Sequence, residues 1–263
     1  MPPNDPYRAR VVASQPVSEI RMPGDPAARP RASVVDRLAV ALYRAAPTVA
    51  PDLVLKRLGI ATPRRREEFY TLDRILRTMP RVDGAILECG TYRGATLLGM
   101  AHVLRCRGMK PKIYGLDSFE GFPDPSPKDA QVDGTFHPDV HKGALADTSY
   151  EQLVAHIQML GWDDHIVVIK GFFEQTLPRL ANQRFSLVHL DCDLYGSYRV
   201  CLDFAYPRML PGGYMVFDDY RLPLNVYPGA DRAVDEFFRD SPEKPERFSD
   251  PRGLRSFVRI RER

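Results

Sequence analysis

The segment RFSLVHLDCDLYGSY, residues 184–198, and the segment LPGGYMVFDDY, residues 210–220, decide the fold of this chain. In each segment a run of apolar residues ends in two aspartates. Apolar runs separated by a helix-length stretch are typical of parallel strands that are buried on both faces. We therefore expect an α/β fold with a mostly parallel central sheet flanked by helices. Ligands bind such sheets at the carboxyl ends of the strands, where these acids lie.

The four acids are Asp191 and Asp193 in the first segment and Asp218 and Asp219 in the second. Carboxylates that converge at one edge repel one another unless a cation lies among them. Carboxylate oxygens favour Mg²⁺, with Mn²⁺ or Ca²⁺ as alternatives, over zinc. The sequence thus predicts a divalent metal site. The alternative is that the acids only cap the loops and helices that follow the strands.

Composition sets limits on function. The chain has 263 residues, of which 44% are hydrophobic, and its net charge is +3. That length is enough for one α/β domain with an appendage, and that charge gives no basis for nucleic acid binding. The sequence has no apolar run long enough for a membrane span and no apolar segment of a secretory signal near Met1, so we expect a cytoplasmic protein. The four cysteines have no metal-type spacing, and we expect them to be reduced and buried.

Three regions are expected along the chain. Residues 1–32 are proline-rich and form a disordered or extended tail. Residues 33–80 form a helical extension, and residues 81–263 form the main α/β domain. Within the extension, the helix around Leu38–Tyr43 is apolar over much of its surface, so we expect it to pack against a second subunit or over the pocket of a small-molecule ligand. A homodimer is the preferred form.

A glycine-containing turn begins the main domain. Glu88, Gly90 and Gly94 form the pattern E-x-G-x-x-x-G after a short apolar strand, which is neither a Walker A loop nor a dinucleotide fingerprint. The glycines allow a ligand to approach the backbone closely, and the next helix offers free N–H groups. The following strand ends in Asp117, at the position from which an acid accepts the two hydroxyls of a ribose. The alternative is that Asp117 only caps the turn into Ser118.

Residues 120–147 are rich in Gly, Pro and Asp and show no periodicity. A loop of this length inside a compact domain is usually a functional lid or a disordered segment. Further along, Phe172 and Phe173 lie at the tip of another apolar strand, where they either flank a planar ligand or pack in the core.

Five motifs together carry a family resemblance: ECGTYRGAT at 88–96, GLDSFEGF at 115–122, KGFF at 170–173, DCDLYGSY at 191–198 and GGYMVFDDY at 212–220. The chain resembles the macrocin O-methyltransferases and their relatives, which methylate deoxysugars of novobiocin-type and mycinose-bearing antibiotics. The resemblance covers roughly residues 69–238. It implies a Rossmann-like class I methyltransferase that uses S-adenosylmethionine and Mg²⁺ and acts on a glycoside or polyol.

The resemblance also implies roles for individual residues. The residues implied to surround the methionine part of the cofactor are Glu88, Gly90, Thr91, Tyr92 and Thr96. Asp117 would hold the ribose, and Ser118 and Phe172 would lie near the adenosine. Asp191, Asp218 and Asp219 would bind the metal, with Asp191 also adjoining the cofactor.

One position departs from the wider group of metal-dependent O-methyltransferases. That group often has Lys or His three residues after the first metal aspartate, where this chain has Leu194. Asp191 and Asp193 are therefore the candidates for the catalytic base. Two other functions stay open at this point. One is methylation of a catechol-like phenol, whose adjacent hydroxyls also chelate Mg²⁺. The other is a non-catalytic protein of the same fold that binds an adenosine nucleotide.

Overall fold

The computed structural model describes residues 66–81, 83–247 and 255–261. The predicted tail over 1–32 and the apolar helix around residues 38–43 lie outside the described residues, as does most of the predicted extension over 33–80. The division of the chain into three regions therefore stays a prediction.

The described strands form one sheet of seven strands in the order β3-β2-β1-β4-β5-β7-β6. The strands are β1 (Ala85–Cys89), β2 (Ile113–Asp117), β3 (Ile166–Lys170), β4 (Phe185–Leu190), β5 (Met209–Phe217), β6 (Glu246–Arg247) and β7 (Ser256–Arg259). Strands β1 to β5 are parallel, whereas β7 is antiparallel to β5 and β6 is antiparallel to β7. This confirms the predicted mostly parallel sheet. The strand order reverses between β1 and β4, which is where ligands bind in sheets of this kind.

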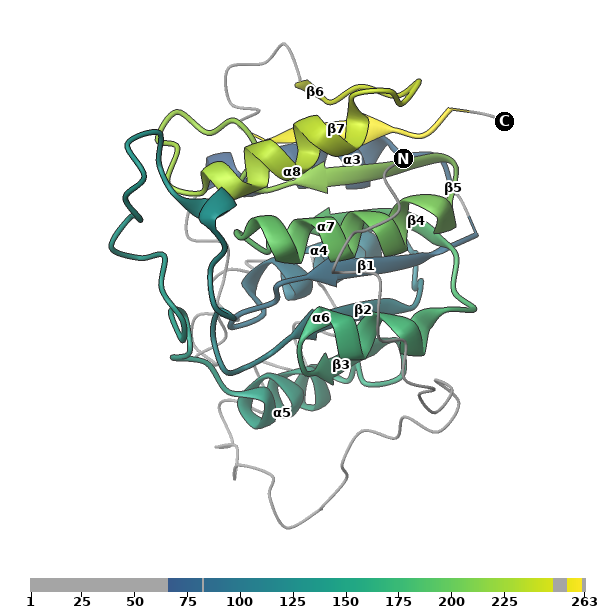
Figure 1. Ribbon diagram of the computed structural model, residues 1–263. Helices are drawn as coiled ribbons and strands as arrows, with labels where there is room; N and C mark the ends of the chain where they lie inside the picture. Colours follow the sequence, from purple (N-terminus) through teal and green to yellow (C-terminus); the bar gives the residue numbers. More distant parts are fainter. Residues whose placement is uncertain (1–65, 82, 248–254, 262–263) are drawn as a thin grey trace.

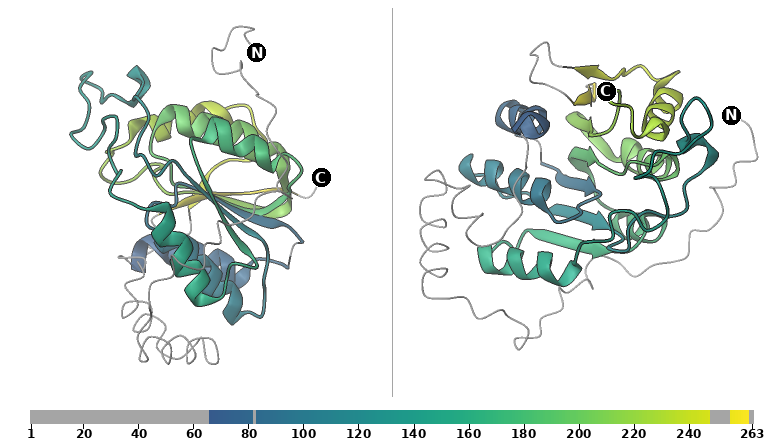
Figure 2. Two further views of the ribbon diagram at one scale, coloured as in Figure 1. Left: turned by 90° about the horizontal axis from the view of Figure 1, so that it is seen from below. Right: turned by 90° about the vertical axis from the view of Figure 1, so that its left-hand side faces the viewer.

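Helices cover both faces of the sheet (Figures 1 and 2). The α-helices are α3 (Arg66–Thr78), α4 (Ala95–Cys106), α5 (Tyr150–Leu160), α6 (Phe173–Thr176), α7 (Tyr195–Ala205) and α8 (Pro228–Phe238). Short 3-10 helices are η4 (Pro127–Asp129), η5 (Leu177–Leu180) and η6 (Tyr206–Arg208). The right-hand view of Figure 2 shows α3, α4 and α5 on one face and α7 and α8 on the other.

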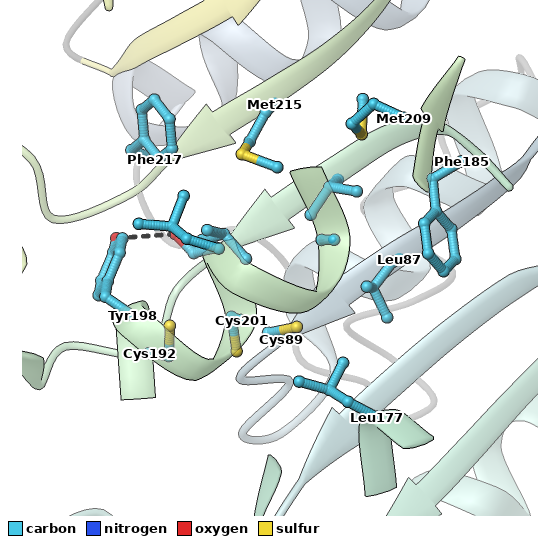
Figure 3. Packing of buried hydrophobic residues seen from close by; sticks show 14 of the residues in the cluster. Leu87, Cys89, Leu177, Phe185, Cys192, Tyr198, Cys201, Met209, Met215 and Phe217 are labelled. Carbon is cyan, nitrogen blue, oxygen red and sulfur yellow. Dashed lines mark hydrogen bonds between the residues drawn. The ribbon is translucent and has the colours of Figure 1, made fainter. Parts of the chain in front are cut away.

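Each face of the sheet has its own apolar core. The core under α3, α4 and α5 includes Leu72 and Ile86, and the core under α7 and α8 includes Leu87 and Phe217. Alternate residues of one strand point to opposite faces, so neighbours such as Ile86 and Leu87 serve different cores. Figure 3 shows part of the second core, where Cys89, Cys192 and Cys201 lie together as buried free thiols. The fourth cysteine, Cys106, is also free but only half-buried.

Contacts between elements set several boundaries. Residues 211–213, although they contain two consecutive glycines, lie inside β5, because the sheet pairing already begins at Met209 opposite Phe185. Ser149 is the N-cap of α5 and accepts from the N–H of Gln152, whereas the hydroxyl of the preceding Thr148 donates to the carbonyl of Tyr92.

The last helix and the last two strands complete the sheet and its cover. Helix α8 begins at Pro228, so Asp231 lies in its first turn. Strand β7 pairs with β5 on one side and is covered on its outer side by β6, the edge strand. Among the described residues, none of the helices combines the length and the hydropathy that crossing a lipid bilayer requires.

The long loop between β2 and α5 is more ordered than its sequence suggests. Its two arms pair at their base, where the N–H of Phe122 donates to the carbonyl of Ala144 at 2.9 Å. Phe122, Val140 and Ala144 form a small apolar cluster with Leu194, and the partly buried Tyr227 packs against it. In Figure 1 the loop rises past the carboxyl ends of the strands to reach α8. It therefore forms one wall of the site.

Candidate active site

The tip of β2 is organised around the carboxylate of Asp117. Its two oxygens accept the backbone N–H groups of Tyr92 and Phe119, each at 2.7 Å. Both donors have positive φ angles, 48° at Tyr92 and 54° at Phe119, a conformation that L-residues adopt at a cost. A carboxylate oxygen has two lone pairs, so each oxygen of Asp117 still has one for a further donor.

The turn after β1 lies against the loop after β4. Gly90 has φ 90°, and a Cβ added there would lie 1.7 Å from the carbonyl oxygen of Asp191. The N–H of Asp191 donates to the carbonyl of Cys89 at 2.9 Å. Only glycine fits this contact, because any side chain would push the two loops apart. The contact joins the tips of β1 and β4 at the point where the strand order reverses.

A cavity of about 180 Å³ opens at this point. Its walls come from the tips of β1, β2, β3 and β4 and from the long loop. The lining residues are Gly90, Tyr92, Asp117, Ser118, Gly121, Phe122, Pro123, Leu145, Gly171, Phe172, Phe173, Glu174, Asp191, Cys192, Asp193 and Ser197. One cavity thus contains the predicted ribose acid, Asp117, the two aromatic residues of the KGFF motif, and Asp191 and Asp193.

The four aspartates predicted from the sequence meet beside this cavity. Asp191 and Asp193 follow β4, and Asp218 and Asp219 follow the neighbouring strand β5. Asp193 has φ 58°, and its N–H donates to the carboxylate of Asp219 at 3.2 Å. We call these four side chains the acid cluster.

Electrostatics divides the acid cluster. Burial and the charges of Asp218 and Asp219 raise the pKa of Asp191 well above its ordinary value, and burial and the same two charges do so for Asp193. Burial and the charge of Asp218 raise the pKa of Asp219 to about 7. For Asp218, His189 and Arg255 outweigh burial and lower the pKa. For the other three acids, burial and mutual repulsion outweigh the nearby cations.

The contacts agree with this division. Both oxygens of Asp218 accept from the guanidinium of Arg255 at 2.7 Å. Asp219 accepts from the hydroxyl of the buried Tyr198 at 3.1 Å. Within the described part of the chain, no ion pair joins Asp191, Asp193 or Asp219 to a cationic side chain. A bound cation at these three acids would relieve the repulsion that raises their pKa values.

Two sets of three side chains have ligand atoms within 4.8 Å of one another. One set is Asp191, Asp193 and Asp219, and the other is Asp191, Asp218 and His189. The predicted ligands Asp218 and Asp219 thus belong to different sets, and Asp191 belongs to both. Oxygen ligands of this kind suit a hard divalent cation such as Mg²⁺.

Three predicted cofactor residues do not line the cavity. Glu88 is buried and bonds to His189, Thr91 is buried beside Gly115, and Thr96 is half-buried in the first turn of α4. Glu88 Oε2 and Thr91 Oγ1 are buried without a hydrogen-bond partner. Unpaired buried polar atoms are rare, so these two indicate a partner beyond the protein atoms, either a ligand or a water. Together with the glycine turn at Gly90, they fit a polar cofactor with an amino-acid part.

Sequence reasoning missed several residues that shape the site. His189 interrupts the apolar strand FSLVHL, and a polar residue in such a strand is a signal that points to a buried partner. Arg255 and Tyr198 carry no such signal, because their partners are distant in the sequence. Asp129, in the long loop, accepts from the N–H of Tyr195 at the start of α7 at 2.6 Å.

Solved structures of methyltransferases share this fold. A calicheamicin methyltransferase matches 92% of this chain and 98% of its own at a TM-score of 0.58 and 19% identity. The O-methyltransferase NovP matches 87% of this chain and 99% of its own at a TM-score of 0.55 and 21% identity. At these identities the likeness supports the fold alone, that of a class I methyltransferase.

Sequence comparisons identify the protein family of this chain. The chain is 32% identical to an 8-demethyl-8-(2,3-dimethoxy-alpha-L-rhamnosyl)-tetracenomycin-C 4'-O-methyltransferase of Streptomyces olivaceus, over 79% of this chain and 73% of the relative. It is 30% identical to a mycinamicin III 3''-O-methyltransferase of Micromonospora griseorubida, over 54% of this chain and 57% of the relative. The family model described as macrocin-O-methyltransferase (TylF) matches residues 62–244. The chain belongs to this macrocin-O-methyltransferase family and is an S-adenosylmethionine-dependent O-methyltransferase.

Proposed function

We propose that this enzyme methylates a hydroxyl of a sugar carried by a glycosylated natural product and that it requires a divalent ion, Mg²⁺ or in its place Mn²⁺. The observation that carries the proposal is the single cavity lined by both Asp117 and the acid-cluster residues Asp191 and Asp193. A cofactor held at one end and an acceptor held at the other would meet inside it. The sequence relatives are named as O-methyltransferases of a rhamnosyl-tetracenomycin and of mycinamicin III, and these names support the acceptor class.

In this proposal the cofactor occupies the end of the cavity built by β1 and β2. Asp117 accepts the ribose hydroxyls, and Ser118 and Phe172 contact the adenosine. Gly90 and Tyr92 line the methionine part, while Glu88, Thr91 and Thr96 support that turn from behind. S-adenosylmethionine supplies a methyl group on a positively charged sulfur, and its transfer to a hydroxyl leaves a neutral thioether and a proton.

The acid cluster would hold the ion and the acceptor. Asp191 is the central ligand because it belongs to both ligand sets, and Asp218 and Asp219 complete the proposed site. A bound Mg²⁺ supplies Lewis acidity, which lowers the pKa of a nearby sugar hydroxyl. Holding the hydroxyl in a fixed orientation toward the methyl group lowers the barrier further.

The proton of the hydroxyl goes to a carboxylate of the cluster. Asp193 and Asp191 are the candidates, because both line the cavity. Leu194, which occupies the position of a Lys or His in many metal-dependent relatives, has no group that accepts a proton. Asp193 is the better candidate if Asp191 is committed to the ion.

The test is methyl transfer from S-adenosylmethionine to a panel of glycosides with and without adjacent free hydroxyls, with the products read by mass spectrometry. We expect methylation of a glycoside with adjacent hydroxyls, loss of activity in EDTA and recovery with Mg²⁺. Unchanged methylation in EDTA would show that the acids are structural. Methylation of catechols alone, with no glycoside accepted, would favour the phenol alternative.

Family membership removes the non-catalytic alternative. A homodimer and a cytoplasmic location remain proposals. The helix on which the dimer was predicted lies outside the described residues, so sedimentation of the full chain is the direct test. A clean monomer that stays active after deletion of residues 1–60 would contradict it.

A further inference from the structure

Four charged side chains form a row across four neighbouring strands. Glu88 comes from β1 and His189 from β4, whereas Asp218 directly follows β5 and Arg255 directly precedes β7. We call these residues the charge row. Their signs alternate, and their side chains are 1%, 0%, 18% and 7% exposed, respectively. The row lies beside the acid cluster, because Asp218 belongs to both.

Strand pairing places each charge next to its partner. Glu88 and His189 are paired residues of parallel strands, and His189 Nδ1 lies 3.1 Å from Glu88 Oε1. His189 Nε2 lies 3.5 Å from Asp218 Oδ1. Phe217 pairs with Ser256 in the antiparallel ladder, so the next residues along, Asp218 and Arg255, face each other.

Arg255 is the most firmly held member of the row. Its Nε and one terminal nitrogen donate to the two oxygens of Asp218, each at 2.7 Å. Its backbone N–H donates to the hydroxyl oxygen of Thr71 on α3, at 3.4 Å. A two-pronged contact of this kind fixes the plane of the carboxylate as well as its position.

The position of Arg255 is hard to explain by stability alone. A buried ion pair is often no more stable than apolar residues of the same size, because both charges lose their hydration. Arg255 is not among the residues that line the cavity, so it does not contact the ligands there directly. What Arg255 does is fix the orientation of Asp218 beside Asp191.

We propose that Arg255 is a positioning residue for the divalent ion: its guanidinium fixes the carboxylate of Asp218 beside Asp191. Each carboxylate oxygen keeps a second lone pair, so the contact with Arg255 leaves Asp218 able to bind a cation. This inference rests on the proposed metal site and adds a residue that does not line the cavity.

The test uses the full chain without cofactor and measures the dissociation constant of Mn²⁺ by electron paramagnetic resonance. We expect Arg255→Met to weaken Mn²⁺ binding about tenfold or more, the usual effect of losing a residue that orients a metal ligand. Binding of S-adenosylhomocysteine, measured by calorimetry, should stay within about twofold, because Asp117 lies at the other end of the cavity. The matched control is Arg259→Met, which changes an exposed arginine of β7 that stacks on Tyr214.

The outcomes separate this inference from the proposed function. If the wild-type chain does not bind Mn²⁺, the proposed metal site fails and the inference fails with it. If the wild type and a folded Arg255→Met variant bind Mn²⁺ equally, the inference alone is overturned. If Arg255→Met does not fold, Arg255→Lys decides, because lysine keeps the charge but lacks the two-pronged contact. We expect it to weaken Mn²⁺ binding about threefold or more, and unchanged affinity would overturn the inference.

Discussion

The two ends of the cavity are formed by different parts of the chain: backbone groups at one end and charged side chains at the other. At the tips of β1 and β2, the backbone makes the site, with Asp117 taking two N–H groups and Gly90 pressed against the loop after β4. At the tips of β4 and β5, charged side chains make the site, and their partners are Tyr198 and Arg255. The first end depends on chain conformation, whereas the second depends on the balance of charge.

This difference leads to separate sensitivities. A hydrogen bond from a backbone N–H is present whenever the chain is folded, so the cofactor end should bind its ligand without an ion. Buried carboxylates without a cation repel one another, so the acid end should depend on an ion. Mutations at one end should therefore leave the ligand of the other end largely unaffected.

The largest effect is expected from Asp191→Asn, because Asp191 belongs to both ligand sets. Turnover should fall about 10³-fold, which is about 4 kcal/mol in activation free energy. Affinity for S-adenosylhomocysteine, measured by calorimetry, should stay within about threefold. Asp203→Asn, an exposed acid of α7 paired with Arg199, is the matched control. A similar loss of cofactor affinity in Asp191→Asn would mean that the two ends are not independent.

Binding of Mn²⁺, measured by electron paramagnetic resonance, distinguishes the two ligand sets. Asp193→Asn removes a member of one set, and Asp218→Asn removes a member of the other. Weaker Mn²⁺ binding in Asp218→Asn alone would support the proposed ligands Asp191, Asp218 and Asp219. Weaker binding in Asp193→Asn alone would assign the ion to Asp191, Asp193 and Asp219. Asp218 would then pair with Arg255 without binding the ion.

Gly90→Ala should damage both ends together, because Gly90 is the contact between them. The added methyl group would lie 1.7 Å from the carbonyl oxygen of Asp191, at a φ angle of 90°. Strain and overpacking should lower the free energy of unfolding by about 3 kcal/mol or more, measured in urea. The control is Gly108→Ala, where φ is 67° and nothing lies within 4 Å. That variant should cost only about 1 kcal/mol. Equal costs would show that the loops can separate without penalty.

Asp117→Ala should affect the cofactor end alone. Charge-assisted hydrogen bonds to two ribose hydroxyls stabilise the complex by about 1.5 to 3 kcal/mol, so cofactor affinity should fall tenfold or more. Mn²⁺ affinity should not change. The control is Asp124→Ala, an exposed acid of the long loop paired with Lys142. Unchanged cofactor affinity in calorimetry would remove Asp117 from the cofactor site.

The sequence predicted the features that depend on local pattern. The apolar runs of β4 and β5, the acids at their ends and the glycine turn after β1 all follow from residues close together in the chain. Contacts across long separations could not be predicted in this way. Asp218 and Arg255 are 37 residues apart, and their pairing depends on the antiparallel return of β7. The charge row is a product of strand order, which no single segment encodes.

The long loop shows the same limit. Its composition indicates a lid or a disordered segment, because it has no periodic apolar pattern. In the structure it is held by Asp129, which accepts from an N–H that lies 66 residues further along the chain. Its small apolar cluster also takes Leu194 from another loop.

The smallest effect is expected from Asp129→Ala, which tests how this wall of the cavity is held. Asp129 is 2% exposed, and one oxygen accepts the first N–H of α7, which has no partner within its own helix. The other oxygen accepts the N–H of Ser126, and Gly229 of α8 leaves space for the carboxylate, since a Cβ there would lie 1.9 Å from it.

Loss of these bonds should lower the free energy of unfolding by about 2 kcal/mol, the usual effect of losing a helix cap or leaving a buried donor unpaired. Amide hydrogen exchange should become faster over residues 123–142 and stay unchanged in β1 and β4, because the sheet does not depend on the loop. The control is Asp133→Ala, which removes an exposed turn contact with Thr135 in the same loop. If exchange over residues 123–142 is unchanged in Asp129→Ala, the loop is held by its apolar cluster and by Lys128, which contacts Tyr195 and Glu236. The wall of the cavity would then differ from the cofactor end, which is organised around the single carboxylate of Asp117.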